Sequence, residues 1–145
     1  MNYTLKELKI LTKKISNRIK IGTAIYIKGQ LGTGKTTITK LITENLFQKY
    51  KKKRCLVTSP TFNIVQYYLI KKDIIIAHYD LYRLKKSGDL NNIGLYDIED
   101  KVISFIEWPE LIKKKNTNRI EINLRYTNKN NERNISVKYF GSAKR

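Results

Sequence analysis

One stretch of the chain matches the pattern G-x-x-x-x-G-K-[ST] at every constrained position: Gly29-Gln30-Leu31-Gly32-Thr33-Gly34-Lys35-Thr36. Residues 23–28 before it predict a short buried strand, and residues 37–47 after it predict an amphipathic helix. A strand, a glycine-rich loop and a helix in this order aim backbone N–H groups and a helix N-terminus at an anion. The stretch therefore predicts a loop that binds the phosphates of a nucleotide.

The residue types in the loop have separate uses in such a site. The glycines let the backbone bend and approach a phosphate closely, Lys35 can reach the β- and γ-phosphates, and the Thr36 hydroxyl can ligate Mg²⁺. A plain glycine-rich turn would not need a Lys-Thr pair at this spacing. The expected nucleotide-binding residues of the loop are Gly29, Gly32, Thr33, Gly34, Lys35, Thr36 and Thr37.

Two acidic residues follow apolar runs that predict strands. Asp80 comes after residues 74–79, and Glu107 comes after residues 102–106. In doubly wound sheets the ligand crevice lies beyond the carboxyl ends of the strands, so both acids would point toward a bound Mg-nucleotide. Either could instead be a helix N-cap or a solvated turn carboxylate. Two of them beside a complete phosphate loop favour the handling of metal and water, with Thr36, Glu107 and Asp80 as metal ligands.

Three further side chains each have two interpretations. Thr61, in the turn at residues 59–62, is either a loop hydroxyl that senses the metal or γ-phosphate, or an ordinary turn threonine. His78 is the only histidine and alternates with apolar neighbours, which favours a structural histidine over a general base. Trp108, directly after the acid, is either a core residue or a lid over the site.

Composition bounds the class of protein. The chain has 145 residues, 41% of them hydrophobic, which predicts one domain with its own core. The single cysteine, Cys55, excludes an internal disulfide and a cysteine-cluster metal site. No apolar run approaches the roughly 18 residues of a membrane span, and the first residues lack a signal-peptide core. We expect a cytoplasmic protein without membrane contact.

The charge is strongly positive, with 30 Lys and Arg against 12 Asp and Glu. A net charge of +18 would attract a polyanion such as RNA. The alternative is drift toward lysine together with basic runs at helix ends, at residues 49–54 and 113–115, where they complement the helix dipole. The sequence favours this second explanation and leaves direct RNA contact open.

Periodicity predicts a single α/β domain over residues 1–145. Thr4 and Glu7 have capping-box spacing and open a predicted helix over residues 5–20. Further helices are expected within residues 81–93, which a Ser87-Gly88 break interrupts, at 94–100 and at 110–115. Strands are expected at residues 23–28, 55–58, 62–70, 73–79, 102–106, 119–126 and 134–140. We expect three layers around a mixed, mainly parallel sheet.

Four blocks, at residues 29–37, 59–62, 78–84 and 105–110, closely resemble the TsaE family (formerly YjeE) in order and spacing. The phosphate loop alone is generic, whereas the H-[FY]-D-L-Y-R-L and [IV]-E-W blocks are specific to that family. The resemblance covers most of the chain and implies a P-loop NTPase fold. It further implies an ATPase that uses Mg²⁺, is slow alone, and acts with TsaB and TsaD. Their complex makes N6-threonylcarbamoyladenosine at position 37 of tRNAs that read ANN codons.

The resemblance also implies roles for residues that match the family motifs. Lys35 and Thr36 would hold phosphate and metal, Glu107 would take the Walker-B-like metal role, and Asp80 would order water or metal. Residues 59–62, with Thr61, would be the first switch segment, Trp108 would belong to the functional core, and Arg133 would lie close to the nucleotide. The chain departs from the family at Gln30, which is usually acidic, and at Thr33, which is usually small.

Other function classes remain open at this point. One is a small-molecule P-loop kinase, although Arg83 is the only arginine between the two acids and a basic lid is poorly supported. Another is a basic RNA-binding module in which nucleotide only stabilises the fold. The isolated chain is expected to be a monomer.

Overall fold

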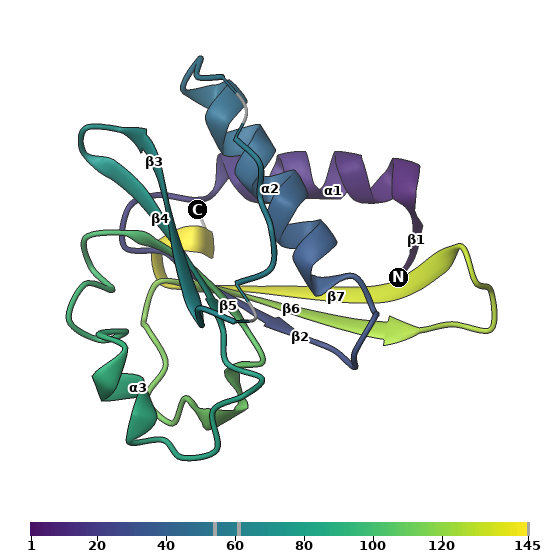
Figure 1. The fold of residues 1–145 in the computed structure, drawn as a ribbon. Helices are drawn as coiled ribbons and strands as arrows, with labels where there is room; N and C mark the ends of the chain where they lie inside the picture. Colours follow the sequence, from purple (N-terminus) through teal and green to yellow (C-terminus); the bar gives the residue numbers. More distant parts are fainter. Residues whose placement is uncertain (54, 61, 145) are drawn as a thin grey trace.

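The computed structural model describes residues 1–53, 55–60 and 62–144, which build one seven-stranded sheet in the order β1-β7-β6-β2-β5-β4-β3 (Figure 1). Its strands are β1 Asn2–Thr4, β2 Ala24–Lys28, β3 Val65–Lys71, β4 Ile74–Asp80, β5 Ile103–Glu107, β6 Arg119–Tyr126 and β7 Glu132–Phe140.

The four central strands, β6, β2, β5 and β4, run parallel, and the outer pairs β1–β7, β7–β6 and β4–β3 are antiparallel. Every residue of β5 is buried, as expected for a parallel strand covered on both faces. The register pairs Asp80, the last residue of β4, with Glu107, the last residue of β5. The mixed α/β sheet predicted from the sequence is confirmed.

Helices α1 (Leu5–Asn17) and α2 (Lys35–Lys49) lie together on one face of the sheet (Figure 1). The other face is covered by residues 81–101, which are mostly irregular and include the short helix α3 (Asp89–Asn92), and by the 3-10 turn η1 (Pro109–Leu111). Each face has its own apolar core. The helical side buries residues such as Ile15, Ile25, Ile38, Ile42, Ile76 and Phe105, and the other side buries Tyr79, Leu81, Leu90, Leu95 and Ile106.

Most predicted elements are found within a few residues of their expected bounds. The β3–β4 pair and the β6–β7 pair are antiparallel hairpins, as predicted. Helix α1 begins with the predicted capping box but ends at Asn17. Strand β1 and the C-terminal 3-10 turn η2 (Gly141–Lys144) were not predicted. Within the described residues, no helix is long and apolar enough to cross a membrane.

Three predictions are wrong. Residues 55–58 are not a strand, because β3 already occupies the sheet edge beside β4, and Leu56 is left 78% exposed. Residues 94–100 form turns instead of a helix, and they begin at Gly94, whose φ of 66° is left-handed. The predicted helix at residues 110–115 is reduced to the single turn η1.

The N-cap of α1 gives a stability prediction with a pH signature. The hydroxyl of Thr4 donates to Glu7 Oε2 at 2.7 Å and accepts from the Glu7 N–H at 3.4 Å. Thr4→Ala should therefore lower the free energy of unfolding by about 1 kcal/mol at pH 7.

Hydrogen bonds from the Thr4 backbone and hydroxyl lower the pKa of Glu7. Its contribution is thus present above the ordinary glutamate pKa of about 4.3 and is lost as the pH falls through the lowered folded value. Urea unfolding at pH 7 and pH 3 should show a smaller gap between Thr4→Ala and wild type at pH 3. An unchanged gap would contradict this account of the cap.

Candidate functional site

The glycine-rich loop joins the central strand β2 to helix α2. Gly32 and Gly34 have φ values of 75° and 103°, a left-handed conformation that glycine adopts without strain. Gly34 is also the N-cap of α2, and no side chain caps this helix end. The first N–H groups of α2 therefore lack the side-chain acceptor that usually satisfies them, which is the arrangement of an anion-binding helix start.

Two hydroxyl groups, one within the loop and one on β6, donate hydrogen bonds to carbonyls of the loop. Thr33 is buried, and its Oγ1 donates to the carbonyl of Gln30 at 2.8 Å. From β6, the Tyr126 hydroxyl donates to the carbonyl of Leu31 at 2.6 Å. The Thr33 side chain is thus engaged within the loop.

Lys35 is held in place by the loop that it follows. Its Nζ donates to the carbonyls of Gly29 and Gln30 at 2.8 and 2.9 Å and lies 3.9 Å from the centre of the Trp108 ring. Burial lowers the pKa of Lys35, and the nearby carboxylates of Glu107 and Asp80 oppose that shift. The ammonium group is therefore partly desolvated. Two backbone carbonyls and an indole ring, none of them charged, hold it close to the loop.

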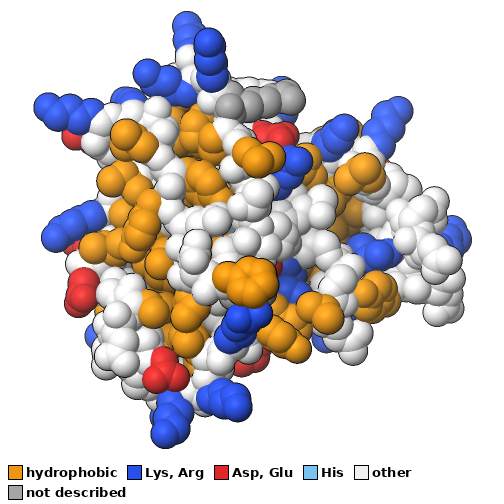
Figure 2. Space-filling model, in the orientation of Figure 1, with side chains coloured by type: hydrophobic (Ala, Val, Ile, Leu, Met, Phe, Trp, Pro, Cys, Tyr) orange, Lys and Arg blue, Asp and Glu red, His pale blue; other side chains and the backbone are white. Residues whose placement is uncertain are grey.

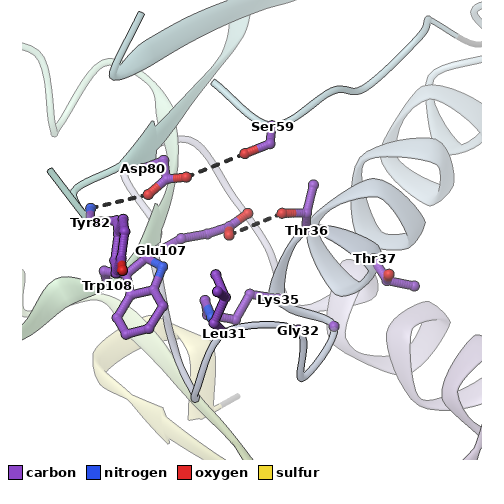
Figure 3. Close-up of a pocket in the computed structure, with 11 residues that line it drawn as sticks. Leu31, Gly32, Lys35, Thr36, Thr37, Ser59, Asp80, Tyr82, Glu107 and Trp108 are labelled. Atoms are coloured by element: carbon purple, nitrogen blue, oxygen red, sulfur yellow. Dashed lines mark hydrogen bonds between the residues drawn. The ribbon is translucent and has the colours of Figure 1, made fainter. Parts of the chain in front are cut away.

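Glu107 is buried, 2% exposed, and connects the strands to α2. Its Oε2 accepts from the Thr36 hydroxyl at 3.1 Å (Figure 3). Its Oε1 lies 2.8 Å from His78 Nε2 on β4 and accepts from the Thr39 hydroxyl at 3.4 Å. A buried carboxylate needs such partners because its desolvation costs several kcal/mol.

Asp80 lies beside Glu107 at the end of the neighbouring strand and is also buried. The Ser59 hydroxyl donates to its Oδ2 at 3.3 Å, and the Tyr82 N–H donates to its Oδ1 at 3.1 Å (Figure 3). Asp80 is therefore linked both to the loop after α2 and to the segment that follows β4.

One cavity of about 360 Å³ brings most of the predicted residues together. Trp108 forms part of its wall, half-buried, with the Tyr82 ring centre 4.8 Å from its own. The cavity is lined by Leu31, Gly32, Gly34, Lys35, Thr36, Thr37, Ser59, Asp80, Tyr82, Glu107 and Trp108 (Figure 3).

Arg133 lies on the other side of the loop. It lines a second cavity of about 240 Å³ together with Gly32, Thr33, Gly34 and Thr37, and its guanidinium stacks 4.8 Å over the Tyr126 ring. The structure thus brings Arg133 to the phosphate loop but not to the acids. Thr61 lies outside the described residues.

Some residues of the site were not expected from the sequence. Thr39 could have been found from its position one helical turn after Thr36. His78 lies two positions before Asp80 on β4, so both side chains lie on the same face of the strand. Its partner Glu107, however, lies 29 residues away in the chain. No sequence pattern indicates that Tyr126 belongs to the site, because its contact with Leu31 depends on the packing of β6 against the loop.

The fold and the loop define a P-loop nucleotide-binding protein of the α/β class. The family model described as "Threonylcarbamoyl adenosine biosynthesis protein TsaE" matches residues 3–135. The chain therefore belongs to the TsaE family, and the resemblance inferred from the sequence blocks is confirmed.

Relatives named "tRNA threonylcarbamoyladenosine biosynthesis protein TsaE" occur in several bacteria. The chain is 33% identical to the Rickettsia typhi protein over 134 residues, covering 92% of this chain and 89% of the relative. It is 30% identical to the Bacillus subtilis protein over 113 residues, or 76% and 65% of the two chains. The crystal structure of B. subtilis YdiB shares the fold, with a TM-score of 0.66 and 23% identity over 97% of this chain and 86% of that one.

The close packing at Gly29 can be tested by substitution. An added Cβ at Gly29 would lie 2.6 Å from Thr33 Oγ1 and 3.0 Å from the Leu124 carbonyl oxygen. Gly29→Ala should therefore lower the free energy of unfolding by about 1–3 kcal/mol, measured by urea denaturation. The matched control is Gly88→Ala, where no atom lies within 4 Å and φ is −63°, and which should stay within about 0.5 kcal/mol of wild type. Equal stability of the two variants would contradict the described loop packing.

Proposed function

We propose that the protein binds MgATP at the phosphate loop and hydrolyses it during the biosynthesis of threonylcarbamoyladenosine in tRNA. Membership of the TsaE family supports the pathway. The observation that carries the ATPase proposal is the convergence of Lys35, Thr36 and Glu107 on one cavity at the start of α2. By the same family argument, the partners are TsaB-like and TsaD-like proteins, and the modified base is adenosine 37 of tRNAs that read ANN codons.

The oxygen groups around Thr36 fit a magnesium ion. Mg²⁺ in nucleotide sites uses one or two carboxylates and the substrate phosphates and keeps several waters. The structure places Thr36 Oγ1 3.1 Å from Glu107 Oε2, with Asp80 paired opposite Glu107. The described residues hold no group of three or more His, Cys, Asp or Glu side chains suited to a metal, so the phosphates would complete the site. When bound, Mg²⁺ would neutralise charge on the triphosphate.

Lys35 and the loop backbone would bind the phosphates. The N–H groups at the start of α2 would donate to them, and the Lys35 ammonium would exchange its two carbonyl partners for phosphate oxygens. That exchange would keep the ammonium beside the loop, to which both carbonyls belong. Both sets of bonds have the ionised ammonium as donor, and those to phosphate are the stronger set because the acceptor is charged as well.

The two acids would divide the remaining work. Glu107, bonded to Thr36, would hold the metal, whereas Asp80, held by Ser59 and the Tyr82 N–H, would orient the attacking water or a metal-bound water. Trp108 would cover the cavity and limit water around the phosphates. Thr61 would act as the switch hydroxyl that its sequence block implies. Arg133 would contact the nucleotide from the second cavity.

No observation favours the other function classes. Arg83 stacks 4.6 Å over the Phe62 ring and does not line the cavity of Lys35 and Glu107, so it gives no support to a kinase lid. On the face shown in Figure 2, Lys and Arg side chains lie at the outline and in smaller part near the middle, separated by hydrophobic and other side chains. That distribution does not favour an RNA-binding patch on this face.

Substitutions should separate phosphate binding from metal handling. Lys35→Ala should weaken ATP binding by tenfold or more, because a hydrogen bond to a charged group contributes about 1.5–3 kcal/mol. Glu107→Ala should keep nucleotide binding in EDTA but need a much higher Mg²⁺ concentration and lose hydrolysis. Isothermal titration calorimetry and phosphate release measure these effects. Normal hydrolysis by the assembled complex carrying Glu107→Ala would contradict the assignment of Glu107.

Partner binding should depend on the nucleotide. We expect the wild-type chain to capture the TsaB–TsaD pair of its host more strongly with MgATP than without it, because the nucleotide would order residues 59–62 and 80–84. Lys35→Ala should lose this difference in a pull-down. Capture that is equal for both chains, with and without ATP, would argue against an ATP-dependent role in the complex.

A further inference from the structure

His78 contacts a residue of the proposed metal site but has no role in the chemistry described so far. It is fully buried on β4, and its Nε2 lies 2.8 Å from Glu107 Oε1. A carboxylate oxygen can only accept, so Nε2 carries the proton of this bond. The neighbouring positions on the same face, Ile74 and Ile76, are occupied by apolar core residues.

The two oxygens of Glu107 are divided between two environments. Oε1 faces the buried side, toward His78 and Thr39, and Oε2 faces Thr36 at the cavity. The bond from Thr39 is long, 3.4 Å, and its hydroxyl is shared with the Lys35 carbonyl. His78 therefore supplies the stronger of the two contacts that fix the orientation of the carboxylate.

The other ring nitrogen argues against a purely structural histidine. In the described part of the chain, His78 Nδ1 is buried and has no hydrogen-bond partner. A histidine kept only to satisfy polar groups of the core would be expected to bond through both nitrogens. Here a polar ring is buried with one nitrogen unsatisfied, and its single bond goes to Glu107.

We propose that His78 is a positioning residue that holds Glu107 Oε1, so that Oε2 stays directed at Thr36 and the magnesium of MgATP. The proposal rests on the proposed function, since it assigns Glu107 to the metal. Residues that hold a metal ligand in this way orient it without touching the metal, and their loss typically weakens metal affinity or activity about 10–100-fold.

Two substitutions differ in whether they can replace Nε2. The amide nitrogen of Gln in His78→Gln is as many bonds from Cα as Nε2, whereas that of Asn in His78→Asn reaches only the Nδ1 position. The measured quantity is the Mg²⁺ concentration that gives half of the Mg²⁺-dependent change in ADP binding. ADP binding is monitored through the fluorescence of Trp108, the only tryptophan. His78→Asn should raise this concentration about tenfold or more, and His78→Gln should restore most of the loss. ADP affinity in EDTA should be unchanged in both.

A double-mutant cycle with Glu107→Gln separates positioning from folding. In the Glu107→Gln background, His78→Asn should change the Mg²⁺ requirement less than about twofold, because no carboxylate remains to be oriented. Thermal unfolding identifies the variants that fold. Should His78→Asn not fold, His78→Leu, which suits a buried strand and lacks the donor, must give the same rise.

The outcomes distinguish this inference from the proposed function. Equal Mg²⁺ requirements for wild type and the Asn and Leu variants, or equal effects in both Glu107 backgrounds, would overturn the role of His78 alone. Absence of Mg²⁺-dependent nucleotide binding by the wild-type chain would overturn both proposals.

Discussion

The buried carboxylate of Glu107 is the constraint on which the rest of the site depends. It lies at the end of a strand that is buried along its whole length, and it accepts from His78 on the next strand and from Thr36 and Thr39 on α2. Leaving such a charge unpaired would cost several kcal/mol, so the fold must keep these partners together. The same carboxylate thus links the sheet to the helix that begins at the phosphate loop.

The sheet topology explains why the functional residues meet at one place. Strand β2 leads into the loop and pairs in parallel with β5, which pairs in parallel with β4. The carboxyl ends of all three strands therefore lie side by side, and they carry the loop, Glu107 and Asp80. Such a crevice is where open α/β sheets bind ligands. The antiparallel edge strands extend the core without altering this arrangement, and β6 adds the Tyr126 brace on the loop.

The parts that could be predicted from the sequence have local determinants. The loop motif, the capping box of α1 and the two strand-forming runs of β6 and β7 each involve residues close together in the chain. The prediction of a strand at residues 55–58 was wrong because β3 occupies the position beside β4. Which segment takes that position depends on pairing between distant parts of the chain. The bond from His78 to Glu107 was missed for the same reason, although the sequence did favour a buried histidine. The roles of Asp80 and Trp108 follow from the family blocks and that of Arg133 from its place in the wider resemblance, and all three remain proposals.

The central claim is that the loop and the two strand-end acids hold one magnesium triphosphate. A crystal structure with Mg²⁺ and a non-hydrolysable ATP analogue tests it most directly. The account predicts phosphates on the backbone N–H groups at the start of α2, the Lys35 ammonium moved from the Gly29 and Gln30 carbonyls onto phosphate oxygens, and the magnesium ion beside Thr36 and Glu107. A nucleotide bound elsewhere, or a Glu107 carboxylate turned away from the metal, would contradict it.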